Sequence, residues 1–111
     1  MRRGEVWRVR IPFAPGHAQA RDRPALIVQN DPLIASLPTV LIVPFTSTPT
    51  AARFSGTLAV PADDQNGLTM PSVAPVFQMR ALDKRDCQQR LGVLDADTLD
   101  AVLALIDQLV L

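Results

Sequence analysis

The chain has few of the side chains that support disulfide, metal or histidine chemistry. Its 111 residues include one cysteine, Cys87, one histidine, His17, and no tyrosine. A lone cysteine excludes a disulfide within these residues, and no Cys/His spacing typical of zinc or acidic loop typical of calcium occurs. We therefore expect no metal and no cofactor, and we expect Cys87 to be a buried, small apolar residue.

Long apolar runs are absent as well. No run approaches the ~20 residues that a membrane span needs. The start of the chain, MRRGEVWRVRIPF, carries charge but no apolar block of signal-peptide length. We therefore expect a cytoplasmic protein without a membrane partner. The length of 111 residues predicts one domain, residues 1–111, with a core of its own.

The whole chain has no excess of positive or negative charge, but the charged residues are unevenly distributed along it. The 11 basic residues balance the 11 acidic ones. Residues 1–60 carry seven basic and three acidic side chains, whereas residues 61–111 carry four basic and eight acidic ones. Lys84 is the only lysine, and arginine suits bidentate phosphate contacts better than lysine. The distribution allows a basic face for an anionic partner.

Strand patterns dominate the chain up to residue 94. Residues 5–13 alternate, with Trp7, Val9 and Ile11 on one side and the arginines on the other, which predicts a half-buried strand. Further strands are predicted over residues 25–29, 39–45, 57–60, 72–79 and 91–94. Loops or turns are predicted over residues 14–22, 30–32, 46–50, 61–69 and 83–86, the last as a charged turn or short helix.

The end of the chain predicts a helix. Asp95 is a plausible N-cap, and Asp97 in the first turn favours the helix dipole. Apolar residues then recur at helical spacing: Leu99, Val102, Leu103, Ile106, Leu109 and Val110. The predicted fold class is mainly β with a C-terminal α-helix, arranged as a small, partly open β-barrel that the helix caps.

The common catalytic motifs are missing. The chain has no Gly-x-Ser-x-Gly elbow, no glycine-rich phosphate loop and no evident pair of tuned carboxylates. Arginines, hydroxyl groups and amides instead gather at predicted strand ends: Gln19, Arg21, Arg23, Thr46, Ser47, Gln78 and Arg80. These side chains suit a phosphate-bearing ligand, with hydrogen bonds for selectivity.

The order of short motifs adds a resemblance. The motifs are RGEVW at 3–7, RPALIVQND at 23–31, TVLIVPFTS at 39–47, SVA at 72–74, Gln78-x-Arg80 and LDKR at 82–85. In this order and spacing, the chain resembles the MazF/PemK family of toxin–antitoxin ribonucleases. The resemblance implies an SH3-like β-barrel of the CcdB/MazF type that works as a homodimer. It also implies sequence-specific, metal-independent cleavage of single-stranded RNA, and a cognate MazE-like antitoxin whose acidic tail blocks the RNA groove.

The resemblance also implies roles for individual residues. Arg23, directly before the proline of the RPA-type motif, and Thr46, after the strand-ending proline, are the expected catalytic residues. The expected RNA-binding residues are Gln19, Arg21, Ser47, Gln78 and Arg80. The family loop that commonly reads GSEQ is here Gly16-His17-Ala18-Gln19, so a glutamate is missing. His17 is the candidate proton acceptor in its place, because its intrinsic pKa range suits that task.

Several alternatives stay open at this point. Arg23 could be a structural ion-pair partner of Asp22 or Glu5, and Thr46 could cap a turn. Phe77 stands where the family often has an acidic residue, and an aromatic ring there could stack on a nucleobase.

Two other functions also remain open. A DNA gyrase poison of the CcdB type would end Trp-Gly-Ile, whereas this chain ends Leu-Val-Leu. A catalytically inactive RNA-binding or protein-binding relative is the other alternative, because Ala18 and Phe77 replace acidic residues.

Overall fold

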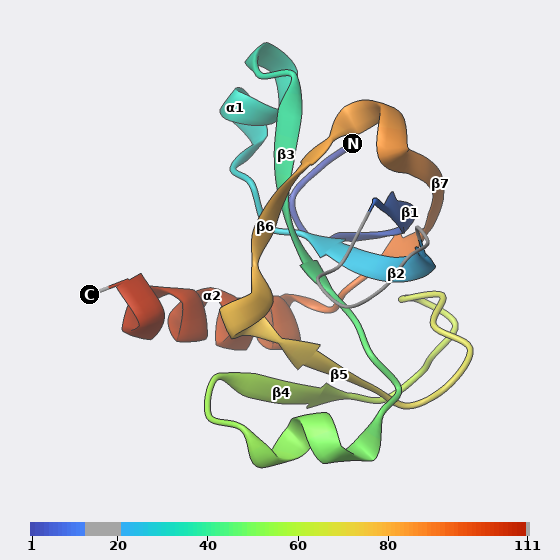
Figure 1. Ribbon diagram of the computed structural model, residues 1–111, viewed down its shortest axis with the longest axis vertical. Helices are drawn as coiled ribbons and strands as arrows, with labels where there is room; N and C mark the ends of the chain where they lie inside the picture. The colour runs from blue at the N-terminus through green and yellow to red at the C-terminus, as the bar shows by residue number, and fades with distance from the viewer. Residues whose placement is uncertain (13–20, 111) are drawn as a thin grey trace.

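Seven strands and a C-terminal helix build most of the described part of the protein (Figure 1). The computed structural model describes residues 1–12 and 21–110. The strands are β1 (Glu5–Ile11), β2 (Arg21–Ile27), β3 (Thr39–Pro44), β4 (Thr57–Val60), β5 (Ser72–Pro75), β6 (Arg80–Asp83) and β7 (Cys87–Val93). The helices are α1 (Asp31–Ser36) and α2 (Ala96–Val110), with 3-10 turns η1 (Pro49–Arg53), η2 (Val76–Gln78) and η3 (Lys84–Asp86).

The strands form two antiparallel sheets. A five-stranded sheet has the order β6-β3-β2-β1-β7, and β4 pairs with β5 in a second sheet. The three residues of η3 join β6 directly to β7, which are the two edges of the larger sheet. The larger sheet must therefore curl until its edges approach at this turn (Figure 1). The fold class predicted from the sequence is confirmed, but no pairing of β6 with β7 closes the described part of the sheet into a barrel.

The curled sheet separates two apolar clusters. Alternation along β1 sends Val9 and Ile11 into the smaller cluster, which includes Ile27 and Ile42 and has Trp7 at its side. Val6 faces the larger cluster between the two sheets and α2. Arg8 and Arg10 stay exposed, as the period of two predicts.

The C-terminal helix has the predicted cap and the predicted apolar face. The backbone N–H of Thr98 donates to Asp95 Oδ2 at 3.0 Å, and the Thr98 hydroxyl donates to Asp95 Oδ1 at 2.7 Å. Val102 is fully buried, and Leu99 and Ile106 pack against the larger cluster. No helix among residues 1–12 and 21–110 is long and apolar enough to cross a membrane.

The second strand begins earlier than predicted. Arg21 and Asp22 were expected in a loop over residues 14–22 but belong to β2, because Arg21 pairs with Ile11 and Asp22 with Arg10. The expected break at residues 30–32 is the start of α1, where the side chain of Asn30 accepts a hydrogen bond from Leu33 N at 3.1 Å. That N-cap signal was present in the sequence and was missed.

The region after residue 72 also differs from the prediction. The strand expected over residues 72–79 ends at Pro75, and residues 76–78 form η2 instead. A separate strand, β6, then pairs with β3. The predicted short closing strand at 91–94 is the end of the longer β7. Residues 83–86 do form the expected turn, with Asp83 capping η3.

Candidate functional site

A pocket opens where β2 and β3 separate. The two strands pair at Ala25 and Pro44, and Phe45 N donates to Pro24 O at 2.9 Å. The chain after Phe45 then turns to the smaller sheet, where Thr46 and Val73 exchange backbone hydrogen bonds of 3.0 and 2.7 Å. Residues 21–24 and 46–48 consequently diverge and line a pocket of about 460 Å³.

The loop between β4 and β5 supplies the remaining wall of this pocket. Its lining residues are Leu68, Thr69 and Met70, and Ser72 at the start of β5 adjoins them. Asn66, which is 2% exposed, accepts from Asp63 N and Leu68 N and donates to Pro61 O at 2.9 Å. Gly67 has φ of +72°, and a Cβ there would lie 2.2 Å from Leu91 O. The loop is therefore pressed against β7, and its path is fixed by hydrogen bonds.

Arg23 lines the pocket without a partner in the described part of the chain. Its side chain is half-buried, and no hydrogen bond or ion pair joins it to residues 1–12 or 21–110. Asp22 accepts instead from Gln88 Nε2 at 3.5 Å, and Glu5 pairs with Arg90 at 2.8 Å. The alternative that Arg23 is a structural ion-pair partner of Asp22 or Glu5 is therefore wrong for these residues.

Thr46 is held by its own turn. Its Oγ1 accepts a hydrogen bond from Thr48 N at 3.2 Å, while its backbone is fixed to Val73. The turn-capping interpretation is therefore correct, and it is compatible with a role in the pocket. Because the oxygen is fixed as an acceptor, the hydroxyl hydrogen can still be donated to a bound group.

The structure brings together four of the predicted site residues and separates two others. Arg21, Arg23, Thr46 and Ser47 all line the pocket. Gln78 is exposed in η2 and Arg80 lies in β6 opposite Ile42, so neither of them lines it. His17 and Gln19 lie outside the described residues.

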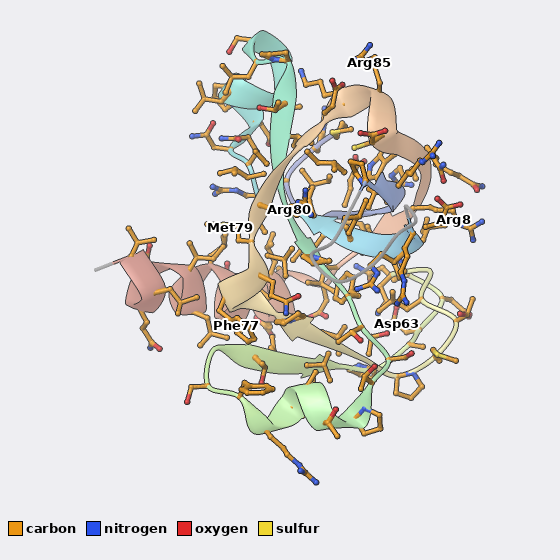
Figure 2. All side chains as sticks on the ribbon, in the orientation of Figure 1. Arg8, Asp63, Phe77, Met79, Arg80 and Arg85 are labelled. Atoms are coloured by element: carbon orange, nitrogen blue, oxygen red, sulfur yellow. The ribbon has the colours of Figure 1, made fainter. Side chains whose placement is uncertain are left out.

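Phe77 lies away from this pocket. Its ring packs edge-on against Phe54, with centroids 6.0 Å apart. Figure 2 shows Phe77 on the side of α2, whereas Arg8 lies on the opposite side beside β2. The interpretation of Phe77 as a stacking platform therefore has no support at this pocket.

Sequence reasoning missed the contribution of the β4–β5 loop to the pocket. Leu68, Thr69 and Met70 fall within or beside a stretch that reads as a turn, and nothing in their identity points to a site. Their position depends on the packing of Gly67 against Leu91, which lies more than twenty residues away. Only the fold reveals this contribution.

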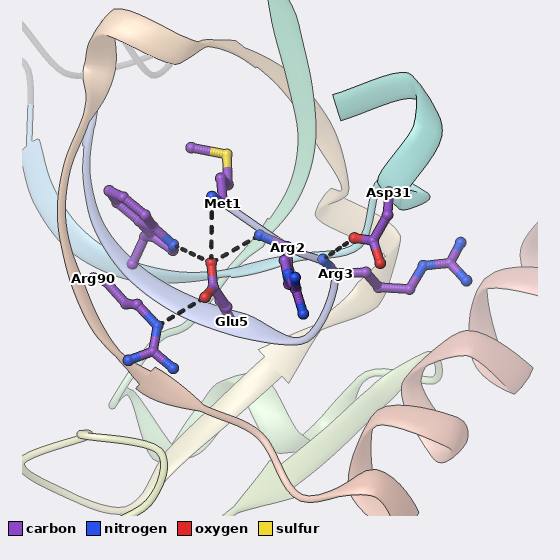
Figure 3. Close-up of polar contacts among 7 residues, drawn as sticks. Met1, Arg2, Arg3, Glu5, Asp31 and Arg90 are labelled. Atoms are coloured by element: carbon purple, nitrogen blue, oxygen red, sulfur yellow. Dashed lines mark hydrogen bonds and ion pairs between the residues drawn. The ribbon is translucent and has the colours of Figure 1, made fainter. Parts of the chain in front are cut away.

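A second polar cluster lies at the start of β1, where both carboxylate oxygens of Glu5 are engaged (Figure 3). Glu5 Oε1 accepts from Trp7 Nε1 at 3.1 Å and from Arg2 N at 2.8 Å, and Oε2 accepts from Arg90 Nε at 2.8 Å. Burial raises the pKa of Glu5, but the hydrogen bonds from Trp7, Arg2 and Arg90 outweigh it and hold the pKa below its ordinary value. This cluster fastens β1 to β7.

Cys87 does not have the character of a nucleophile. It is half-buried at the start of β7. Burial raises the pKa of its thiol, and the carboxylates of Asp86 and Asp83 raise it further. The thiol therefore stays protonated at neutral pH. Cys87 packs against the smaller apolar cluster, but it is only partly buried, whereas the sequence predicted a buried residue. In residues 1–12 and 21–110, no three His, Cys, Asp or Glu side chains gather as a metal site would require.

Comparison with known proteins gives consistent matches over nearly the whole chain. Residues 2–110 match the family described as PemK-like, MazF-like toxin of type II toxin–antitoxin system. Endoribonuclease MazF2 of Mycobacterium bovis is 32% identical over 101 residues, which are 90% of this chain and 88% of the relative.

Two solved structures share the fold. MazF from Deinococcus radiodurans superposes with a TM-score of 0.77 at 26% identity, covering 99% of this chain and 96% of that one. A mycobacterial endoribonuclease in complex with its cognate antitoxin superposes with a TM-score of 0.74 at 21% identity, covering 99% and 94% of the two chains.

Proposed function

Since the chain belongs to the PemK-like, MazF-like toxins of type II toxin–antitoxin systems, we propose that it is an endoribonuclease that cuts single-stranded RNA at short recognition sequences without a metal ion. The observation that carries this proposal is Arg23. It is a half-buried guanidinium that lines the pocket beside Thr46 and has no partner among the described residues. A buried or half-buried cation without a counter-charge is costly, and an incoming phosphate would supply that charge.

The proposed reaction uses the substrate's own 2′-OH. The 2′ oxygen attacks the adjacent phosphorus as it loses its proton, and the bond to the 5′ oxygen of the next nucleotide breaks. The products are a 2′,3′-cyclic phosphate and a free 5′-OH, so atoms balance without an added nucleophile. Charge accumulates on the non-bridging oxygens in the transition state, and a fixed guanidinium stabilises this charge.

The pocket residues divide the remaining tasks. Arg23 stabilises the phosphate and can donate a proton toward the leaving oxygen. Thr46, whose oxygen is fixed by Thr48 N, donates its hydroxyl hydrogen to a phosphate oxygen. Arg21 and Ser47 line the same pocket and bind the RNA backbone next to the scissile phosphate. Gln78 and Arg80, which lie outside the pocket, contact nucleotides farther from the cut, and Gln19 is a further RNA-binding residue.

The proton acceptor in this proposal is His17. A neutral imidazole has the pKa range for accepting the 2′-OH proton near neutral pH. Within the described lining, Asp22 is the one carboxylate, and it already accepts a hydrogen bond from Gln88. We expect His17→Ala to lower the cleavage rate more than Asp22→Asn, and to remove the acidic limb of the pH–rate profile.

The proposal includes the setting of the activity. Residues 1–111 act as a single toxin domain in the cytoplasm and as a homodimer. A cognate MazE-like antitoxin with an acidic tail inhibits the enzyme by covering the basic RNA groove. Support comes from the known structures of the same fold in which a MazF protein is bound to MazE or an endoribonuclease is bound to its cognate antitoxin.

The decisive experiment is cleavage of a long RNA in EDTA, with the new ends mapped. The proposal predicts cuts at a short recurring sequence, with 5′-OH ends, that Arg23→Ala abolishes. Arg23→Lys keeps the charge but not the bidentate geometry and should retain a fraction of the rate. A wild-type protein that leaves every RNA intact, or that needs a divalent metal, would contradict the proposal.

A further inference from the structure

The pocket has a second side whose chemistry differs from that of the arginine side. Arg21, Arg23, Thr46, Ser47 and Thr48 present charge and hydroxyl groups. The facing loop presents Thr69 and Met70 above Leu68, which is itself buried at 7% exposure. We call Thr69 and Met70 the loop wall. We infer that the loop wall binds the nucleobase next to the scissile phosphate and selects the recognised base, an inference that rests on the proposed RNA cleavage.

Met70 is the first observation behind this inference. Its side chain is 51% exposed, although it stands at the rim of a pocket and large apolar side chains are usually buried. A thioether is flexible and polarizable, and it makes favourable contacts with aromatic rings. A nucleobase offers such a ring, so base binding would cover the side chain that the free protein leaves in water.

The backbone that carries the loop wall is held in place, which favours a selective contact. Asn66 is buried and ties the start of the loop through hydrogen bonds to Asp63, Leu68 and Pro61. At the other end, the Ser72 hydroxyl donates to Met70 O at 3.0 Å and fixes the backbone of the methionine. A contact surface held before binding loses little conformational entropy when the ligand arrives.

The two sides fit the two parts of a nucleotide. In single-stranded RNA the bases can be splayed away from the phosphate backbone, and proteins that read sequence contact those unstacked bases. A phosphate at Arg23 and Thr46 leaves the attached base to extend toward the loop wall. The pocket volume of about 460 Å³ lies within the ~300–1,000 Å³ typical of small-ligand sites.

Thr69 gives this contact hydrogen-bonding capacity. Its hydroxyl can both donate to and accept from the edge of a base, and it lies beside Met70 on the same exposed stretch. An apolar contact alone discriminates weakly between bases. A hydroxyl that is left without its partner by the wrong base discriminates more strongly.

The test compares the base preference of variants, not only their rates. A randomised single-stranded RNA library is cut by the wild type, Met70→Ala, Met70→Leu and Thr69→Val, and the bases around each cut are counted. Leu33→Ala is the matched control, since Leu33 is 41% exposed and lies in α1, outside the pocket. We expect Met70→Ala to lower kcat/KM about tenfold on the preferred sequence and to relax the base preference at one position beside the cut.

Further expected results are that Met70→Leu restores part of the preference, that Thr69→Val shifts it and that Leu33→Ala leaves it unchanged. Unchanged base preferences in both Met70→Ala and Thr69→Val, with cleavage intact, would overturn the inference and leave the proposed function standing.

A binding experiment separates the two failures. The same randomised library with 2′-deoxy sugars cannot undergo 2′-OH attack, and bound sequences are recovered and counted. If the wild type cuts no RNA, the proposed function fails. The loop-wall inference then stands only if the bound sequences show a base preference that Met70→Ala removes, and otherwise it fails as well.

Discussion

Arg90 in β7 and Arg23 in β2 both lie beside β1, but their side chains have opposite surroundings. Arg90 donates to Glu5 at 2.8 Å in a cluster where Trp7 and the Arg2 backbone also donate to the same carboxylate. Arg23 lines a pocket, and its side chain makes no hydrogen bond or ion pair with the described residues. The first arrangement contributes to stability, whereas the second keeps a charge ready for a ligand.

The difference follows from what the sheet does at each place. Around Glu5, β1 lies between β2 and β7, so side chains from neighbouring strands can meet and satisfy one another. At Arg23, β3 leaves β2 after Phe45 and pairs through Thr46 with Val73 instead. The departure of a strand removes the partners that Arg23 would otherwise have. Unsatisfied polar groups concentrated at such a point are a common feature of functional sites.

After Arg23, Thr46 offers the largest expected effect among the residues that line the pocket. Thr46→Val removes the hydroxyl at nearly constant volume, and we expect RNA cleavage to fall about 100-fold, the lower end of the range for loss of one transition-state donor. Because Thr48 N also loses its acceptor, about 1 kcal/mol of stability should be lost. Thr46→Ser keeps the hydroxyl and should keep most of the rate. Single-turnover cleavage rates, with thermal melting as the control, check both. Equal losses in the two variants would contradict a role for the hydroxyl.

Glu5→Gln should act on stability and leave cleavage unchanged. The amide keeps the shape of Glu5 but turns a donor toward Arg90, so we expect a loss of about 1–2 kcal/mol at pH 7. Urea denaturation gives the free energy of unfolding, and the cleavage rate of the folded variant is the control. A large loss of activity in a stable Glu5→Gln protein would contradict the assignment of stability to the Glu5 cluster and of cleavage to the Arg23 pocket.

The same variant has a defined pH dependence. The pKa of Glu5 is lowered in the folded protein from 4.5, so its contribution is fully present above that pH and is lost as pH falls through the folded pKa. The stability difference between wild type and Glu5→Gln should therefore shrink below about pH 4.5. Asp83 and Asp95, whose pKa values are also lowered, titrate alike in both proteins and cancel in the difference.

Arg8 should give the smallest effect. It is exposed, lies directly opposite Pro24 of the pocket lining and makes no ion pair with the described residues. If it contacts a flanking phosphate, Arg8→Ala should weaken RNA binding a few-fold at low salt. The slope of log K against log salt should also fall by about 0.7, as expected for one phosphate contact on a single strand. Fluorescence anisotropy across a salt series measures both. Arg53→Ala, a change of the same charge in η1, is the matched control.

Local patterns predicted the elements whose residues carry their own signals. The alternation around Val9, the run at residues 57–60 and the capped helix after Asp95 all appear in the structure close to their predicted places. The start of β2 did not, because its pairing depends on how far β1 extends. The curl of the larger sheet was not predicted either. It depends on η3, which joins the two edge strands, and the three residues of η3 read in sequence only as a charged turn.

The site shows the same division. The motif around Arg23 and the position of Thr46 after a strand-ending proline were sufficient to place both in one prediction, and they do line one pocket. Gln78 and Arg80 share a motif but not the pocket, because Pro75 ends β5 and η2 redirects the chain. Met70 could not be found from sequence, since its position depends on Gly67 packing against Leu91.

The most direct test measures kcat/KM for RNA cleavage and Tm together for Arg23→Ala and Arg90→Ala. We predict that Arg23→Ala lowers kcat/KM about 100-fold or more while Tm stays within error of the wild type. Arg90→Ala should keep the cleavage rate and lose about 1 kcal/mol, which lowers Tm by a few degrees. The account is contradicted if Arg23→Ala melts as early as Arg90→Ala and its remaining folded protein cleaves RNA at the wild-type rate.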